Sequence, residues 1–156
     1  MRIIVMRHGE ATFFCDDRIL STNGQKEAYD TAMQLKSYLG TVDRIICSPK
    51  TRAVQTANIV KDVLNTDTQI DYLSELTPSG DVDSVISYVE AVCNPDSTVL
   101  LVSHLPLVEY LSYELVHMKR CSPSFKTACA LVIDTNGRKT DFKKFFTPFN
   151  DPVLFD

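Results

Sequence analysis

Three short runs of apolar residues, each followed by a stretch with helical spacing, most constrain how this chain can fold. The runs are Ile3–Met6, Arg44–Cys47 and Val99–Val102. Unbroken apolar runs of this length are typical of strands that are buried on both faces of a parallel sheet. Strands that alternate with helices in turn favour an α/β sandwich. We therefore expect three layers, with a mostly parallel central sheet and helices on both of its faces.

The stretches between these runs have the spacing of helices with one buried face. The first has apolar residues at steps of four, three and four: Ala28, Ala32, Leu35 and Leu39. Thr22 and Gln25 have the spacing of a capping box at its start, and Gly40 is typical of a helix end. Ser48 and Pro49 predict the cap and first residue of a second helix. Its expected buried face is Ala53, Ala57, Val60 and Leu64.

The second half of the chain continues the alternation. A weaker strand is expected over Gln69–Leu73 and a helix over residues 81–93, with Val82, Val85, Ile86 and Val89 facing inward. Pro106 is expected to open another helix, whose inner face would carry Leu107, Tyr110, Leu111 and Leu115. Strands over Ala128–Ile133 and Phe142–Phe146, joined through the turn signal Thr135-Asn136-Gly137, predict an antiparallel edge.

Size and composition limit the classes of function. The 156 residues suit one domain spanning residues 1–156, and a net charge of −4 gives no basic surface for nucleic acid. Five scattered cysteines without CxxC spacing indicate reduced thiols rather than a disulfide framework or a zinc site. No apolar run approaches the roughly 20 residues that span a bilayer, and residue 1 leads into the first strand without a signal peptide. We expect a cytoplasmic protein with no membrane or nucleic-acid partner.

Polar residues with catalytic potential follow three of the predicted strands. In sheets of this kind, ligands bind beyond the carboxyl ends of the strands. Arg7 and His8 follow the first strand, Arg52 falls in the first turn after the second, and His104 follows Val99–Val102. Two of the three histidines and two arginines should therefore meet at one edge of the sheet. His117, near a predicted helix end, is interpreted as structural.

This set of side chains is suited to phosphoryl transfer. Arginine forks bind phosphoryl oxygens bidentately, and a neutral imidazole can attack phosphorus. The cations Arg7 and Arg52 should lower the pKa of His8 and keep it unprotonated, while His104 donates to an oxygen in the transition state. Gly9 allows close backbone approach behind the nucleophile. We predict a phosphatase with a phospho-His8 intermediate, inorganic phosphate as product, and no metal or other cofactor.

Other chemistries fit the same residues less well. A cysteine phosphatase would need five residues between Cys47 and Arg52, whereas the chain has four and Pro49 removes one amide. A metal-dependent hydrolase could use His8 and His104, but the arginines would repel the cation. A non-catalytic module that only binds phosphorylated proteins remains a further alternative, although a complete nucleophile set gives it no support.

Three separated motifs in this order resemble the histidine phosphatase (phosphoglycerate mutase-like) superfamily. They are Arg7–Glu10, Ser48–Ala57 and Ser103–His104, and the resemblance covers nearly the whole chain. Three further segments resemble the phosphohistidine phosphatases within it: Ser21–Gly24, Glu75–Asp81 and Ser103–Val108. The resemblance implies that His8 is phosphorylated and that Arg7, Arg52 and His104 form the phosphate pocket.

The resemblance also implies two further assignments. Arg18, in a loop before the first helix, is expected to reach the phosphate. Glu75 is the positional candidate for the general acid, with Asp81 and Glu10 as alternatives. The alternative interpretation of Glu75 is a helix-capping or surface carboxylate.

The segment between Arg52 and His104 bears on the substrate. Larger members of the superfamily carry a helical insertion over small substrates, whereas here only 51 residues (53–103) separate the two side chains. A domain without a lid insertion suits a phosphorylated protein, for which the resemblance implies a histidine phosphotransfer domain in signalling. A small-molecule phosphomonoesterase or a phosphoglycerate mutase-type enzyme is the alternative within the fold.

Overall fold

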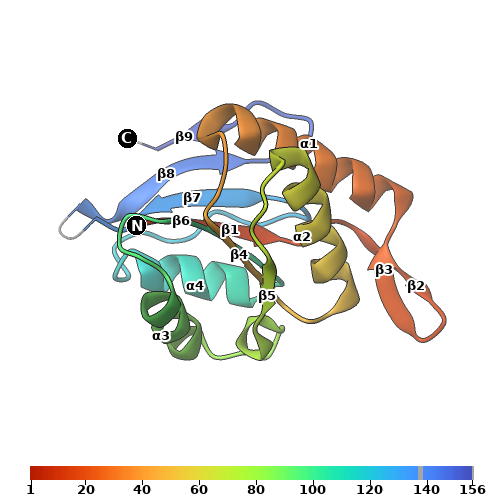
Figure 1. The fold of residues 1–156 in the computed structure, drawn as a ribbon, viewed down its shortest axis with the longest axis horizontal. Coiled ribbons are helices and arrows are strands. Elements are labelled where there is room, and N and C mark those ends of the chain that lie inside the picture. Colours follow the sequence, from red (N-terminus) through yellow and green to blue (C-terminus); the bar gives the residue numbers. More distant parts are fainter. Residues whose placement is uncertain (137–138, 156) are drawn as a thin grey trace.

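The computed structural model describes residues 1–136 and 139–155 (Figure 1). Its helices are α1 (Thr22–Leu39), α2 (Thr51–Leu64), α3 (Val82–Val92) and α4 (Leu107–Leu115), and Ser74–Leu76 form a short 3₁₀ helix, η1. Its strands are β1 (Arg2–Arg7), β2 (Ala11–Phe14), β3 (Asp17–Leu20), β4 (Arg44–Cys47), β5 (Ile70–Tyr72), β6 (Thr98–Ser103), β7 (Ala130–Asp134), β8 (Asp141–Phe146) and β9 (Val153–Leu154).

The central sheet is mixed, with the strand order β5-β4-β6-β1-β7-β8-β9 in the part of the chain that the structure describes. β5, β4, β6 and β1 pair in parallel, and β7, β8 and β9 continue the sheet antiparallel. The predicted α/β sandwich with an antiparallel edge is therefore confirmed. Because β1, β4 and β6 are parallel neighbours, the residues that follow them emerge at the same edge of the sheet.

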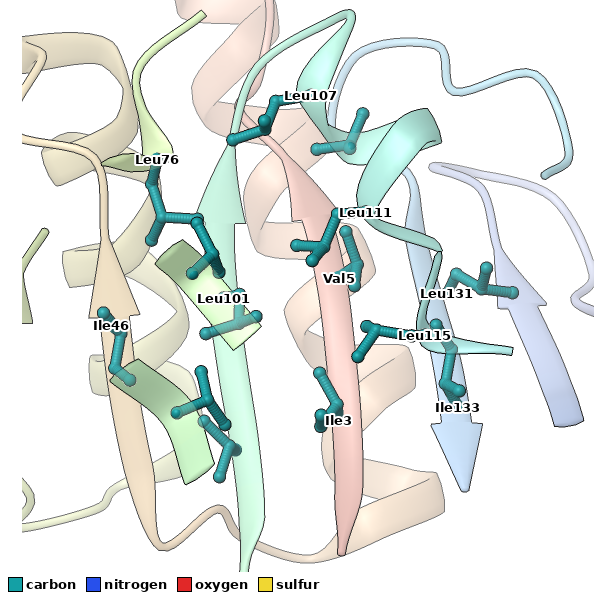
Figure 2. Packing of buried hydrophobic residues seen from close by; sticks show 14 of the residues in the cluster. Ile3, Val5, Ile46, Leu76, Leu101, Leu107, Leu111, Leu115, Leu131 and Ile133 are labelled. Carbon is teal, nitrogen blue, oxygen red and sulfur yellow. The ribbon is translucent and has the colours of Figure 1, made fainter. Parts of the chain in front are cut away.

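Helices cover both faces of this sheet, since the strands bury apolar side chains on each side. On one face, α3 and α4 pack over β1, β4, β6 and β7, and Val5, Leu101 and Leu131 belong to one apolar cluster with Leu111 of α4 (Figure 2). On the other face, α1 and α2 pack over the alternate residues of the same strands. Successive side chains of each strand point to opposite faces of the sheet, so each strand contributes to two separate hydrophobic cores.

A hairpin that the sequence interpretation missed lies between β1 and α1. β2 and β3 pair antiparallel and extend away from the sandwich (Figure 1). The two residues between them, Cys15 and Asp16, both have positive φ angles, of 46° and 64°, as tight hairpin turns require. The segment that contains Arg18 is therefore strand β3 rather than a loop.

Three local predictions were wrong in detail. Ser21, not Thr22, caps α1, because its hydroxyl accepts a hydrogen bond from the backbone of the third helical residue. The second helix begins at Thr51, so Ser48 and Pro49 precede it rather than open it. Tyr110 is 60% exposed instead of facing the core. The predicted turn at 135–137 includes residue 137, which lies outside the described residues.

No helix in the described part of the chain is both long and apolar enough to cross a membrane.

Leu101→Ala should lower the free energy of unfolding by about 2–5 kcal/mol. Leu101 is buried in β6, at the centre of the sheet, and its truncation leaves a cavity that the neighbouring strands cannot close. Urea unfolding of the variant measures the loss. The exposed Leu154→Ala is the control and should change stability by less than about 0.5 kcal/mol. A similar loss in both variants would contradict this picture of the core.

Candidate active site

Strand register brings two histidines together at the carboxyl edge of the sheet. Arg7 pairs with Ser103 in the parallel β1–β6 ladder, and the His8 amide donates to the Ser103 carbonyl at 3.0 Å. His8 and His104, the next residues along each strand, have ring centroids 4.9 Å apart and planes inclined at 61°. Both side chains are buried, at 4% and 2% exposure. The expected convergence of the two imidazoles is present.

The hydrogen bond of His8 identifies which of its ring nitrogens is free to react. Its Nδ1 lies 2.7 Å from the carbonyl oxygen of Gly9. A carbonyl only accepts hydrogen bonds, so Nδ1 carries the proton in the neutral ring. Nε2 then holds the lone pair, and this nitrogen is the one able to attack phosphorus.

Ser48 orients the second imidazole. The Nε2 atom of His104 lies 2.8 Å from the Ser48 hydroxyl oxygen, which also accepts the Lys50 amide hydrogen at 3.2 Å. All three groups are satisfied when the hydroxyl donates to Nε2, which leaves the hydrogen of His104 on Nδ1. Sequence reasoning treated Ser48 only as a helix cap. Its position directly after β4, opposite the end of β6, was the available signal for this contact.

Arginines surround the two imidazoles. Arg7 donates from Nη1 to the Phe125 carbonyl at 3.0 Å, which fixes its side chain beside the end of β1. Arg52 lies in the first turn of α2, as expected. Arg18 lies on β3, and its charge contributes to lowering the pKa of Arg7, His8, Arg52 and His104. The hairpin thus brings a third guanidinium toward the cluster.

Most of the buried side-chain atoms that lack a hydrogen-bond partner in the described residues are nitrogen atoms of this cluster. Four buried side-chain N or O atoms lack a hydrogen-bond partner in residues 1–136 and 139–155, and three of them are Arg7 Nε, Arg52 Nε and His104 Nδ1. The arginine atoms are obligate donors, and the hydrogen assigned to His104 Nδ1 makes it a third. Buried donors without partners are costly, so their concentration at one place marks a site for an anion with several oxygens.

Burial and positive charge keep both imidazoles neutral. Burial is the largest cause that lowers the pKa of His8 to about 4, and the charges of Arg52 and Arg7 act in the same direction. Burial also lowers the pKa of His104 to about 3, with further contributions from His8 and Arg52. The sequence interpretation had the direction for His8 right but attributed it to the arginines alone.

The backbone behind His8 is held by close packing. A Cβ atom on Gly9 would lie 2.5 Å from the Gly24 carbonyl oxygen of α1, so only glycine allows this approach. The Gly9 amide also donates to the Thr56 hydroxyl of α2 at 3.1 Å. Both contacts fix the carbonyl that orients the His8 ring.

The three candidate acids each have a structural partner near a helix start. Glu75 accepts the Asp81 amide hydrogen at 2.9 Å, just before α3. Asp81 caps α3 by accepting from the amide and hydroxyl of Ser84. Glu10 accepts from the Ser21 hydroxyl at 2.7 Å, at the start of α1. These bonds match the capping interpretation of the carboxylates and give none of them a contact with either imidazole.

Other reactive residues stand apart from this cluster. Cys47 is buried in β4, where burial raises the pKa of its thiol to about 12, so it is unsuited to nucleophilic attack. His117 is exposed beyond α4, and it lines a cavity of about 600 Å³ that none of the cluster residues enters. Within the described residues, no group of three or more histidine, cysteine, aspartate or glutamate side chains is gathered to hold a metal ion.

Stability should fall when the pH drops below about 6.5, because the folded pKa values of His8 and His104 lie below that ordinary value. The unfolded chain then takes up protons first, and stability that is fully present above pH 6.5 is lost toward pH 4. Urea unfolding at pH 7 and pH 5 should reveal a loss of about 2 kcal/mol for each histidine. The double variant His8→Asn/His104→Asn should lose less, and an equal loss in both proteins would refute the burial of two neutral imidazoles.

Known proteins share both the sequence and the fold. Residues 3–77 match the histidine phosphatase superfamily (branch 1). The chain is 38% identical over 146 residues to the phosphohistidine phosphatase SixA of Escherichia coli K12, with 90% of each chain covered. It is 35% identical over 152 residues to a SixA homolog of Haemophilus influenzae, covering 90% of this chain and 92% of that one.

A solved structure of the protein histidine phosphatase SixA complexed with tungstate superposes on this chain with a TM-score of 0.85. The two are 37% identical, and the match covers 95% of this chain and 97% of the other. The sequence identity and the fold point to the same family. The chain therefore belongs to the SixA family of phosphohistidine phosphatases, within the histidine phosphatase superfamily.

Proposed function

We propose that this enzyme removes the phosphoryl group from phosphohistidine on a protein, by way of a phosphoryl group carried on His8. The observation that carries the proposal is the His8 ring, whose Nδ1 is hydrogen-bonded to a carbonyl and whose Nε2 keeps its lone pair under the influence of the Arg52 and Arg7 charges. The related SixA structure is a complex with tungstate, a tetrahedral oxyanion, and this supports a phosphoryl group as the ligand of this chain.

In the first step, His8 Nε2 forms a bond to phosphorus and the bond from phosphorus to the substrate's nitrogen breaks. The His8 ring gains positive charge, and the Gly9 carbonyl stabilises it through the hydrogen on Nδ1. Arg7 and Arg52 hold the phosphoryl oxygens, and Arg18 adds its charge from the hairpin. His104 Nδ1 donates to another oxygen, oriented by the Ser48 hydroxyl at its far side.

In the second step, water attacks phosphorus and the electron pair returns to His8 Nε2. Inorganic phosphate leaves, and the neutral ring is restored with its proton on Nδ1. The low pKa of His8 favours this neutral state at physiological pH, so the nucleophile is ready for the next cycle.

Glu75, in the 3₁₀ helix η1, is the proposed donor of the proton to the departing atom. The demand on this acid depends on the substrate. An imidazole leaves readily once it is protonated, and solvent can supply that proton, whereas an ester oxygen needs a positioned acid. Because the Glu75 carboxylate already accepts the Asp81 amide hydrogen, the site suits a phosphohistidine substrate better than a phosphoester.

The segment between Arg52 and His104 supports a protein as substrate. Residues 53–103 form the remainder of α2, then β5, η1, α3 and β6, all of which belong to the sandwich. We propose one histidine phosphatase domain over residues 1–156, without a lid insertion, acting on a histidine phosphotransfer domain in the cytoplasm.

The decisive experiment compares His8→Asn with the wild type on a radiolabelled phosphohistidine protein. The wild type should release phosphate and, after rapid quenching, carry acid-labile label. The variant should do neither, because it lacks the attacking nitrogen. His117→Asn is the matched control and should keep full activity, since that side chain lies outside the cluster. Near-normal turnover by His8→Asn would overturn the proposal, and turnover of phosphoglycerates alone would favour the mutase alternative.

Arg52→Gln should raise the free energy of the transition state by about 2–4 kcal/mol, which lowers kcat/KM about 30- to 1,000-fold. The variant removes a half-buried guanidinium from the phosphoryl oxygens. Arg52→Lys should fall between the variant and the wild type, because it restores the charge without the planar fork. Steady-state kinetics on the same substrate measure this order. Equal activity of the three proteins would exclude Arg52 from the phosphate site.

A further inference from the structure

Two phenylalanines on the β2–β3 hairpin are unusually exposed. Phe13 and Phe14 keep 81% and 62% of their surface accessible, near the tip of a hairpin that extends away from the sandwich (Figure 1). Successive residues of a strand point to opposite faces, so the hairpin presents one aromatic ring on each face. Large apolar side chains gathered on a projecting element mark a contact surface rather than a core.

The hairpin is fixed to the helix that carries Arg52. The Thr51 hydroxyl donates to the Asp17 carboxylate at 2.5 Å, and the Leu20 amide donates to the Gln55 side chain at 2.7 Å. These bonds join β3 to the first two turns of α2. The rings are therefore held at a set position relative to the phosphate site, which reduces the entropy lost on binding.

The surface of the hairpin is continuous with the phosphate site. Phe13 is the cross-strand partner of Arg18, whose guanidinium carbon lies 5.8 Å from the centre of the Phe13 ring. The charge of Arg18 in turn lowers the pKa of both His8 and His104. A molecule that places a phosphoryl group beside His8 therefore has its remaining surface next to Arg18 and Phe13.

The position of the two rings determines which substrates contact them. Phe13 and Phe14 lie at the turn end of β2 and stay exposed to solvent, whereas His8 is buried at the edge of the central sheet. A phosphorylated amino acid or a small ester fills the phosphate site without touching the tip. A folded protein that inserts a phosphohistidine side chain brings a broad surface against it.

We propose that the β2–β3 hairpin is a docking element for the protein substrate. Phe13 and Phe14 bury their rings against apolar side chains that surround the phosphohistidine on a folded partner protein. Arg18 joins this contact to the phosphoryl group. The inference rests on the proposed function, since it names the part of the enzyme that distinguishes a phosphorylated protein from a small phosphorylated molecule.

The test compares Phe13→Thr/Phe14→Thr with the wild type on two substrates. One is a histidine phosphotransfer domain phosphorylated chemically with phosphoramidate, and the other is free phosphohistidine. Threonine preserves strand propensity and removes the rings. The variant should raise KM for the protein about 10- to 100-fold, the effect expected from two aromatic anchors. Its kcat/KM for free phosphohistidine should stay within about twofold of the wild type.

The exposed strand β9 provides a matched control. Val153→Thr/Leu154→Thr removes two exposed apolar side chains at the far edge of the sheet and should leave both substrates unaffected. An unchanged KM for the protein, or an equal loss on both substrates, would overturn the docking role. If the wild type hydrolyses neither substrate, the proposed function fails, and that result is distinct from a failure of the hairpin alone.

Discussion

The parallel pairing of β1 with β6 is the constraint on which the site depends. It sets Arg7 opposite Ser103, and the next residue of each strand is a histidine. Two imidazoles from positions 96 residues apart in the chain (104 minus 8) thereby become neighbours at the sheet edge. β4 pairs with the other side of β6 and brings Ser48 against His104. A shift of register by one residue would separate these groups and turn the apolar side chains of each strand toward the opposite core.

The chemistry of the site follows from burial as much as from charge. Each imidazole is enclosed, so its neutral form is favoured, and neutrality is what a nucleophilic histidine needs. The guanidiniums nearby oppose protonation further and supply the positive charge that binds phosphoryl oxygens. Part of this arrangement costs stability, because Arg7 Nε, Arg52 Nε and His104 Nδ1 lie buried without partners. The groups that serve phosphoryl binding therefore lower the stability of the fold at this edge of the sheet.

Sequence patterns predicted the elements whose burial is unambiguous. The apolar runs at β1, β4 and β6 and the helical spacing of α1 were correct, because each buries a continuous face. The meeting of His8 with His104 also followed, since parallel strands end at one edge. The β2–β3 hairpin was not predicted, because its turn uses Cys15 and Asp16 in place of the usual glycine-containing pair. Its first strand is largely exposed and lacks the alternation of apolar and polar residues that indicates a half-buried strand. The contact between Ser48 and His104 was also not predicted, because the two residues lie 56 positions apart in the chain.

The state of the His8 ring tests the central claim most directly. Two-bond ¹H–¹⁵N spectra of the protein labelled at its histidine rings report which nitrogen carries hydrogen. At pH 7 the account predicts a neutral His8 ring with hydrogen on Nδ1 and a free lone pair on Nε2. An imidazolium, or a neutral ring with hydrogen on Nε2, would contradict it, because neither leaves a nitrogen that can attack phosphorus from this position.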